Sequence, residues 1–189
     1  MRRFTVLFLF TAAAFSSCHT RRKARKRHEA ERVVAMTDKK AAPTQKFNTV
    51  EYIALYKNIA KREMRLYGIP ASIILAQGIL ESNNGNSELA RNANNHFGIK
   101  STKDWKGKTY YRKTNEDNST FRSYPDVEAS FRDHSEFLTK SRYADLFRLR
   151  SDDYKGWARG LRKDGYATNP DYPQLLINLI EKFDLWKYD

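Results

Sequence analysis

The amino-acid sequence predicts one α+β domain, mainly helical with a small antiparallel β-lobe, over residues 51–189. Apolar residues recur at helical spacing through most of this stretch. One pair of short runs, rich in Tyr, Thr and Phe, instead has the composition of two β-strands. The stretch is long enough to bury a single hydrophobic core and contains no internal repeat, so we expect one domain rather than two.

Two helices are predicted at the start of this domain. The first is closed by Gly68 and carries an apolar stripe made of Tyr52, Leu55, Tyr56, Ile59, Ala60, Glu63 and Leu66. The second begins at Pro70, because the first turn of a helix tolerates a residue without an N–H group. The residues at helical spacing along it are Ile73, Ile74, Gln77, Leu80 and Glu81.

Glu81 is the residue we expect to act as a catalytic acid. Its spacing puts it on or beside the buried face, and the polar turn Ser82-Asn-Asn-Gly85 follows at once. Loss of water on the helix side would raise the pKa of this carboxyl and keep it protonated near neutral pH, as a general acid requires. A Glu that simply points into water at the end of a helix would have the same spacing.

A loop, a hairpin and a helix are predicted in the middle of the domain. Residues 89–105 lack periodicity and indicate an irregular loop. The runs Thr109–Lys113 and Ser119–Tyr124 flank a polar turn that contains Glu116, as in a small β-hairpin. Asp126 suits the N-cap of the next helix, which has Phe131, Ser135 and Leu138 along one face.

Three more helical stretches complete the domain. Two are short, at Tyr143–Leu149 and Tyr154–Lys163, and the segment Gly165-Tyr-Ala-Thr-Asn-Pro170 interrupts the pattern after them. The last helix runs from Pro173 to Phe183, with Leu176, Leu179, Ile180 and Phe183 inward. Trp157 and Trp186 occupy helical positions, and we expect both in the core.

Residues 1–18 are expected to form a lipoprotein-type signal peptide that ends at Cys18. Two arginines precede an apolar run that is too short to span a bilayer permanently, and small residues lead to the single cysteine of the chain. This arrangement resembles the lipobox of bacterial lipoproteins, in which the matching cysteine is lipidated. We therefore expect an exported, membrane-anchored protein of the cell envelope; the alternative is an ordinary cleaved signal.

Residues 19–50 are expected to form a basic disordered tether. Residues 1–50 contain 12 Lys or Arg against three Asp or Glu, whereas residues 51–189 contain 23 against 19. The net charge of +13 therefore describes mostly the tether and not the domain. An exported chain meets anionic lipids and cell-wall polymers before nucleic acid, so we expect no nucleic-acid partner.

Cleavage of a glycosidic bond requires two carboxyl groups in different environments. One group delivers a proton to the leaving oxygen, and the other stabilises the sugar cation or activates water. Glu81, at the end of an apolar helix, and Glu116, in a polar turn, suit these two roles. Glu88, Asp117 and Asp126 are alternatives for the second group.

Aromatic residues gather around the predicted hairpin, where rings can stack on sugar faces; they are Trp105, Tyr110, Tyr111, Phe121 and Tyr124. Packing within the lobe is the alternative role, and we favour it for Phe121. His96 and His134 lack the spacing of metal ligands, and no phosphate-binding loop appears. We expect no metal and no cofactor.

Five segments resemble, in order, motifs of the bacterial glucosaminidase domains of glycoside hydrolase family 73, which includes autolysins and flagellar muramidase-type domains. They lie within residues 52–188 and are Glu81-Ser-Asn-Asn-Gly-Asn-Ser-Glu-Leu-Ala90, Ala93-Asn-Asn-His-Phe-Gly-Ile-Lys100, Trp105-Lys-Gly107, Phe121-Arg-Ser-Tyr124 and Gly165-Tyr-Ala-Thr-Asn-Pro170. The resemblance implies a goose-type, lysozyme-like fold that cuts the β-1,4 glycan of peptidoglycan.

The resemblance also implies roles for single residues. Glu81 matches the general acid, Glu116 is the nearest match to the second carboxylate, and Tyr166 is expected near the cleaved sugar. Substrate-binding residues are expected within the motifs at Phe97, Gly98, Trp105, Tyr110, Tyr124 and Asn169. Many relatives have Trp where this chain has Asn84, so we expect a stacking surface to be missing there, and the sequence around Glu116 matches only loosely.

The function expected from the sequence is that of a monomeric peptidoglycan hydrolase of the endo-β-N-acetylglucosaminidase type. One alternative is a non-catalytic lipoprotein that binds the cell wall. Another is a lytic transglycosylase or muramidase, of which the former needs a single carboxylic acid. Spacing does not choose between inversion, retention and attack by the substrate's own acetamido group.

Overall fold

A computed structural model describes residues 46–113 and 118–189 of the chain, and the folded unit begins at Lys46. The domain therefore starts five residues earlier than predicted. The predicted signal peptide with Cys18, most of the predicted tether, Glu116 and Asp117 lie outside the described residues. Within the described residues, no helix combines the length and the apolar character needed to cross a membrane.

Helix α2 spans Thr49–Tyr67 and matches the first predicted helix. Asn48 and Glu51 form a capping box at its start, with the Glu51 N–H donating to Asn48 Oδ1 over 3.0 Å. Gly68, at a φ of 75°, ends it as predicted. The predicted stripe is too wide, because Leu55 and Leu66 are exposed.

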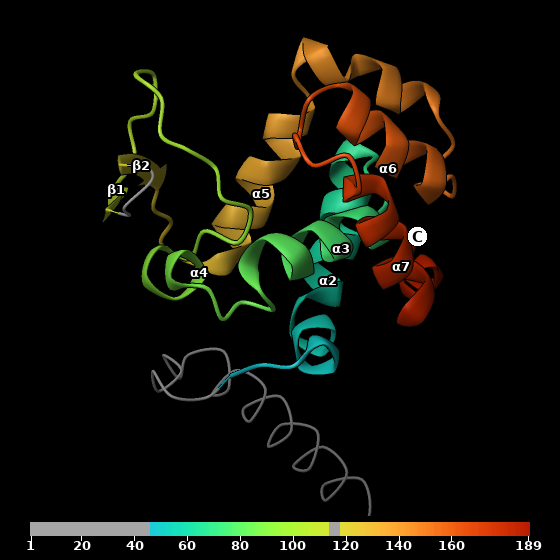
Figure 1. Ribbon diagram of the computed structural model, residues 1–189, viewed down its shortest axis with the longest axis horizontal. Helices are drawn as coiled ribbons and strands as arrows, with labels where there is room; N and C mark the ends of the chain where they lie inside the picture. Colours follow the sequence, from blue (N-terminus) through green and yellow to red (C-terminus); the bar gives the residue numbers. More distant parts are fainter. Residues whose placement is uncertain (1–45, 114–117) are drawn as a thin grey trace, which may run out of the picture. The chain divides into compact units, whose positions relative to one another are not determined.

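Helix α3, Ala71–Ser82, is the central element of the fold (Figure 1). It contacts α2 on one side and the C-terminal helices on the other, and ten of its 12 residues are buried. A helix that is apolar all round must be enclosed in this way. Pro70 precedes the helix directly, and the carboxylate of Asp189 caps it by accepting hydrogen bonds from the Ser72 N–H and Oγ, both at 2.7 Å.

Gly78 lets α2 approach α3 closely. A Cβ atom at this position would lie 2.5 Å from the hydroxyl oxygen of Tyr52, which is fully buried. An Ala in an open helix site stabilises by about 1 kcal/mol relative to Gly. Here we expect Gly78→Ala to lower the free energy of unfolding by about 1–2 kcal/mol, because overpacking costs more than the helix gains.

Urea unfolding measures this effect, and Tyr52→Phe supplies its control. The clash involves the Tyr52 hydroxyl, so Gly78→Ala in the Tyr52→Phe background should cost less than in the native background. An equal cost in both backgrounds would show that the contact with the hydroxyl is not what limits this position.

The small lobe is formed by α4 (Glu88–Ala93), β1 (Thr109–Lys113) and β2 (Asn118–Arg122). The strands pair antiparallel, with Tyr110 opposite Phe121. This confirms the predicted hairpin and its lobe. The prediction of a wholly irregular segment from residue 89 is wrong, because α4 forms there behind the N-cap Ser87.

Five helical segments complete the domain: α5 (Val127–Leu138), the 3₁₀ helix η1 (Ser141–Arg148), α6 (Tyr154–Lys163), α7 (Tyr172–Lys182) and the 3₁₀ helix η2 (Leu185–Tyr188). Asp126 caps α5 as predicted, with Oδ1 accepting from the Ala129 N–H at 2.8 Å. Trp157 is buried, whereas the prediction for Trp186 is wrong because its side chain is 53% exposed. The mainly helical α+β prediction is confirmed, and Figure 1 shows α3 between the hairpin side and the α6–α7 pair.

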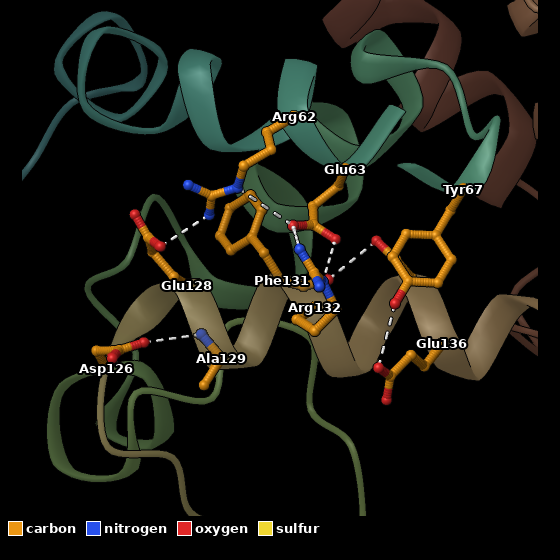
Figure 2. A network of polar contacts seen from close by, with 10 residues as sticks. Arg62, Glu63, Tyr67, Asp126, Glu128, Ala129, Phe131, Arg132 and Glu136 are labelled. Atoms are coloured by element: carbon orange, nitrogen blue, oxygen red, sulfur yellow. Dashed lines mark hydrogen bonds and ion pairs between the residues drawn. The ribbon is translucent and has the colours of Figure 1, made fainter. Parts of the chain in front are cut away.

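A polar contact between α2 and α5 fixes these two helices (Figure 2). Glu63 is fully buried, and both of its oxygens accept hydrogen bonds of 2.8 Å from the guanidinium group of Arg132. Arg62 lies 3.7 Å from the same carboxylate and pairs with Glu128 at 2.8 Å. Tyr67 lies under the Arg132 guanidinium and donates to Glu136. The buried charge is therefore paired from the neighbouring helix.

Candidate active site

Glu81 lies in the last turn of α3, where the helix reaches the surface. The residue is exposed as a whole, but enough protein surrounds its carboxyl group for desolvation to raise its pKa above the usual value. A hydrogen bond from Tyr172 lowers the pKa by a smaller effect. The direction is the one predicted from the sequence, and it favours the protonated form that a general acid needs.

Tyr172 contacts Glu81 directly, although it is not among the site residues predicted from the sequence. Its hydroxyl donates to Glu81 Oε1 at 3.0 Å and accepts from Gln77 Nε2 at 3.0 Å. Tyr172 is the first residue of α7, and Gln77 lies one helical turn before Glu81 on α3. Its position just after the motif that ends at Pro170 was the available sequence signal.

Tyr166 lies beside this pair, in the loop that precedes α7. Its ring centre is 5.8 Å from that of Tyr172 and 6.0 Å from the imidazole of His134. Burial raises the pKa of Tyr166 well above its usual value, and the charge of Glu81 adds to this effect. The structure therefore brings together Glu81 and Tyr166, which the sequence predicted as site residues.

The small lobe contributes Tyr124 and Trp105. The Tyr124 hydroxyl donates to Asp133 Oδ2 at 2.5 Å, and Arg122 donates to Oδ1 of the same carboxylate at 2.6 Å. Burial and the Asp133 carboxylate strongly raise the pKa of Tyr124, which also interacts electrostatically with Tyr166. The guanidinium of Arg122 lies 4.5 Å from the ring centre of Trp105, which meets Tyr124 edge to face. The half-buried Trp105 is thus held on a rigid support and keeps part of its ring free.

The other predicted binding residues have different surroundings. Phe97 is buried in the core and stacks on His134 at 3.9 Å, so it lies under the site and not on its surface. Gly98 has a φ of 65° and open space where a Cβ would lie. Tyr110 donates to Glu88 at 2.6 Å, and the exposed Asn169 accepts from the Asp171 N–H at 2.9 Å.

Two of the carboxylates considered for the second catalytic group, Glu88 and Asp126, already accept hydrogen bonds within the protein. Glu88 accepts from Tyr110, and Asp126 caps α5. Glu116 and Asp117 lie outside the described residues. Within residues 46–113 and 118–189, no cluster of three or more His, Cys, Asp or Glu side chains is arranged to hold a metal ion.

Hydrogen bonds within the turn and to neighbouring segments hold the turn after Glu81 in place. Ser82 Oγ accepts from the Gly85 N–H at 2.7 Å, and Tyr52 is hydrogen-bonded to His96 Nδ1 at 2.9 Å beneath it. Burial lowers the pKa of His96 to about 4, so this imidazole is neutral near pH 7. The Asn86 side chain accepts from the N–H of Phe47 at 2.8 Å and donates to its carbonyl at 2.7 Å.

Residues 57–185 match the glucosaminidase family described as mannosyl-glycoprotein endo-β-N-acetylglucosaminidase. Exo-glucosaminidase LytG of Bacillus subtilis is 37% identical over 65% of this chain and 47% of its own length. Peptidoglycan hydrolase FlgJ of Vibrio parahaemolyticus is 30% identical over 74% of this chain and 49% of its own length. The chain therefore spans about half the length of these relatives.

Solved structures of similar fold have related names. The glycoside hydrolase domain of FlgJ from Salmonella typhimurium has a TM-score of 0.64 and 28% identity, over 75% of this chain and 91% of that domain. The catalytic domain of the autolysin Auto from Listeria monocytogenes has a TM-score of 0.66 and 25% identity, over 94% of this chain and all of that domain. The predicted family and lysozyme-like fold are confirmed.

Proposed function

The chain belongs to the glucosaminidase family, and from this premise we propose that it hydrolyses the β-1,4 glycan strand of peptidoglycan as an endo-β-N-acetylglucosaminidase. The observation that carries the proposal is the Glu81 carboxyl group at the open end of α3, with its pKa raised by burial and one oxygen held by Tyr172. The names of the similar proteins, exo-glucosaminidase, peptidoglycan hydrolase and autolysin, support this substrate class.

Glu81 donates its proton to the oxygen that leaves when the bond between two sugars breaks. Within the described residues its Oε2 atom has no hydrogen-bond partner, so this oxygen is available to the substrate. Tyr166, beside Glu81, contributes a polar hydroxyl on the same side. Glu116, which lies between β1 and β2 in the sequence and outside the described residues, is the residue we propose as the second carboxylate, which stabilises the sugar cation or activates water.

Trp105, which is half-buried, offers the ring face on which we propose that a sugar stacks, and the buried Tyr124 supports that ring edge to face. The Arg122–Asp133 pair holds both rings from behind, so the stacking surface needs little ordering when the glycan binds. We propose that Tyr110 and Asn169 add polar contacts to the glycan. Phe97 and Gly98 shape the loop beneath it.

The N-terminal segment would hold this domain at the membrane. We propose that Cys18 is lipidated and that the basic residues 19–45 lie between the anchor and the folded unit as a tether. The protein then acts in the cell envelope as a monomer. Mass spectrometry of the mature N-terminus tests the anchor, since an unmodified Cys18 would refute it.

Product analysis tests the proposed reaction. Purified peptidoglycan incubated with the protein should release fragments with N-acetylglucosamine at the reducing end, as mass spectrometry can show. Reducing N-acetylmuramic acid would identify a muramidase, and anhydro-sugar ends a lytic transglycosylase. Sedimentation of the protein with the cell wall without released sugar would instead support a non-catalytic binding lipoprotein.

A further inference from the structure

We infer that Tyr172, held by Gln77, is a positioning residue that fixes one oxygen of Glu81 and leaves the acid proton on the other. This inference rests on the proposed function, because it assigns a task within the same reaction. Three residues from two helices form the arrangement, and the bond from Tyr172 joins groups 91 positions apart in the sequence.

The direction of the two hydrogen bonds follows from the groups that form them. The amide nitrogen of Gln77 is a donor without lone pairs for hydrogen bonding, so the Tyr172 oxygen accepts from it at 3.0 Å. The single proton of the Tyr172 hydroxyl then points to Glu81 Oε1, also at 3.0 Å. Since Oε1 already accepts this proton, a protonated Glu81 carries its own proton on Oε2, the oxygen without a partner among the described residues.

The side chains of Gln77 and Tyr172 are held rigidly by the surrounding protein. Gln77 is fully buried in α3 and Tyr172 is 3% exposed, so neither side chain has room to turn away. The Oε1 atom of Gln77 is buried without a hydrogen-bond partner in the described structure. An unpaired buried amide oxygen is costly, and such costs are tolerated mainly where a polar group serves a function.

The groups around Glu81 set the pKa of its carboxyl. Among the described residues, the titratable groups near the Glu81 carboxyl are hydroxyls: Tyr172 from α7 and Tyr166 from the preceding loop, with Tyr143 of η1 and Tyr124 of the small lobe next to Tyr166. Burial raises the pKa of Glu81, and the Tyr172 hydrogen bond opposes it by stabilising the charged form. Tyr172 therefore limits how far the pKa rises, and this keeps Glu81 a strong enough acid to release its proton.

Tyr172→Phe tests this role, because it removes one hydroxyl and keeps the ring. We expect kcat to fall about 10- to 100-fold, the scale of a mispositioned catalytic group. The alkaline limb of the kcat/KM profile should move to higher pH, because the ionised form of Glu81 loses a donor. Gln77→Met, which keeps the volume but frees the Tyr172 hydroxyl, should change both quantities in the same direction by less.

Tyr154→Phe is the matched control. Its hydroxyl donates to the Glu181 carboxylate at 3.2 Å on the surface of α6 and α7, so its loss should leave the rate and the pH profile unchanged. Tyr172→Phe with native kcat and an unmoved alkaline limb would overturn the inference, as would a lower melting temperature accompanied by a native pH profile. Product analysis of the native protein separates the two proposals. If it releases no fragments with reducing N-acetylglucosamine, the proposed function fails; if it does and Tyr172→Phe behaves as native, only the role of Tyr172 fails.

Discussion

Replacing Glu81 by Gln should lower the release of sugar fragments from purified peptidoglycan by at least about 100-fold, since general acid catalysis contributes about 10²- to 10⁴-fold. The amide keeps the shape of the side chain and its oxygen can still accept from Tyr172, so the fold should not change. Circular dichroism and the melting temperature check the fold, and reducing-end assays check the rate.

Glu181→Gln is a matched control, because it makes the same chemical change on an exposed carboxylate of α7. That variant should keep native activity. Undiminished cleavage by Glu81→Gln would refute the assignment of the acid. In the native protein, activity should persist below the raised pKa of Glu81 and decline as the pH rises through it, because the acid must carry its proton before each cleavage.

Replacing Arg132 by Met should produce the largest loss of stability, about 3 kcal/mol, or a fall of about 10 °C in melting temperature. Met keeps an apolar stem of similar length but leaves the fully buried Glu63 carboxylate without its bidentate partner. Arg62, at 3.7 Å, is too far from Glu63 to replace two hydrogen bonds of 2.8 Å. Urea unfolding measures the difference.

Arg62→Met is the control for this prediction. Its pair with Glu128 is exposed, and exposed pairs contribute less than about 1 kcal/mol. The double variant Glu63→Gln with Arg132→Met should recover part of the loss, since it no longer buries an unpaired charge. A loss below about 1 kcal/mol for Arg132→Met would contradict the argument, because it would mean that water reaches Glu63 freely.

The position of Glu81 at the end of α3 was predictable from the sequence because the local pattern determines it. The apolar spacing that ends in Glu81 and a polar turn defines a helix, a buried face and a place where that face meets solvent. The hairpin and the cap at Asp126 follow from equally local signals. The raised pKa of Glu81 then follows from burial alone.

Features that depend on distant contacts or on short elements were not predictable. Tyr172 reaches Glu81 from the last α-helix, and no spacing rule connects the two. Helix α4 has six residues, too few for an apolar period to show. Trp186 follows Asp184, whose φ of 49° ends the helical direction, so the α7 pattern does not extend to it. Leu55 has the spacing of a core residue of α2, but its side chain is 43% exposed.

The two hydrogen bonds between the Asn86 side chain and the Phe47 backbone have a mechanical consequence. Tension applied to the chain ahead of Lys46 would load the two hydrogen bonds of Asn86 before it reached the capping box of α2. Asn86 also donates to the Asn83 carbonyl at 2.8 Å, in the turn that leads out of α3. A domain pulled by its leading segment would thus feel the strain first beside Glu81, while the rest of its core remained unstretched.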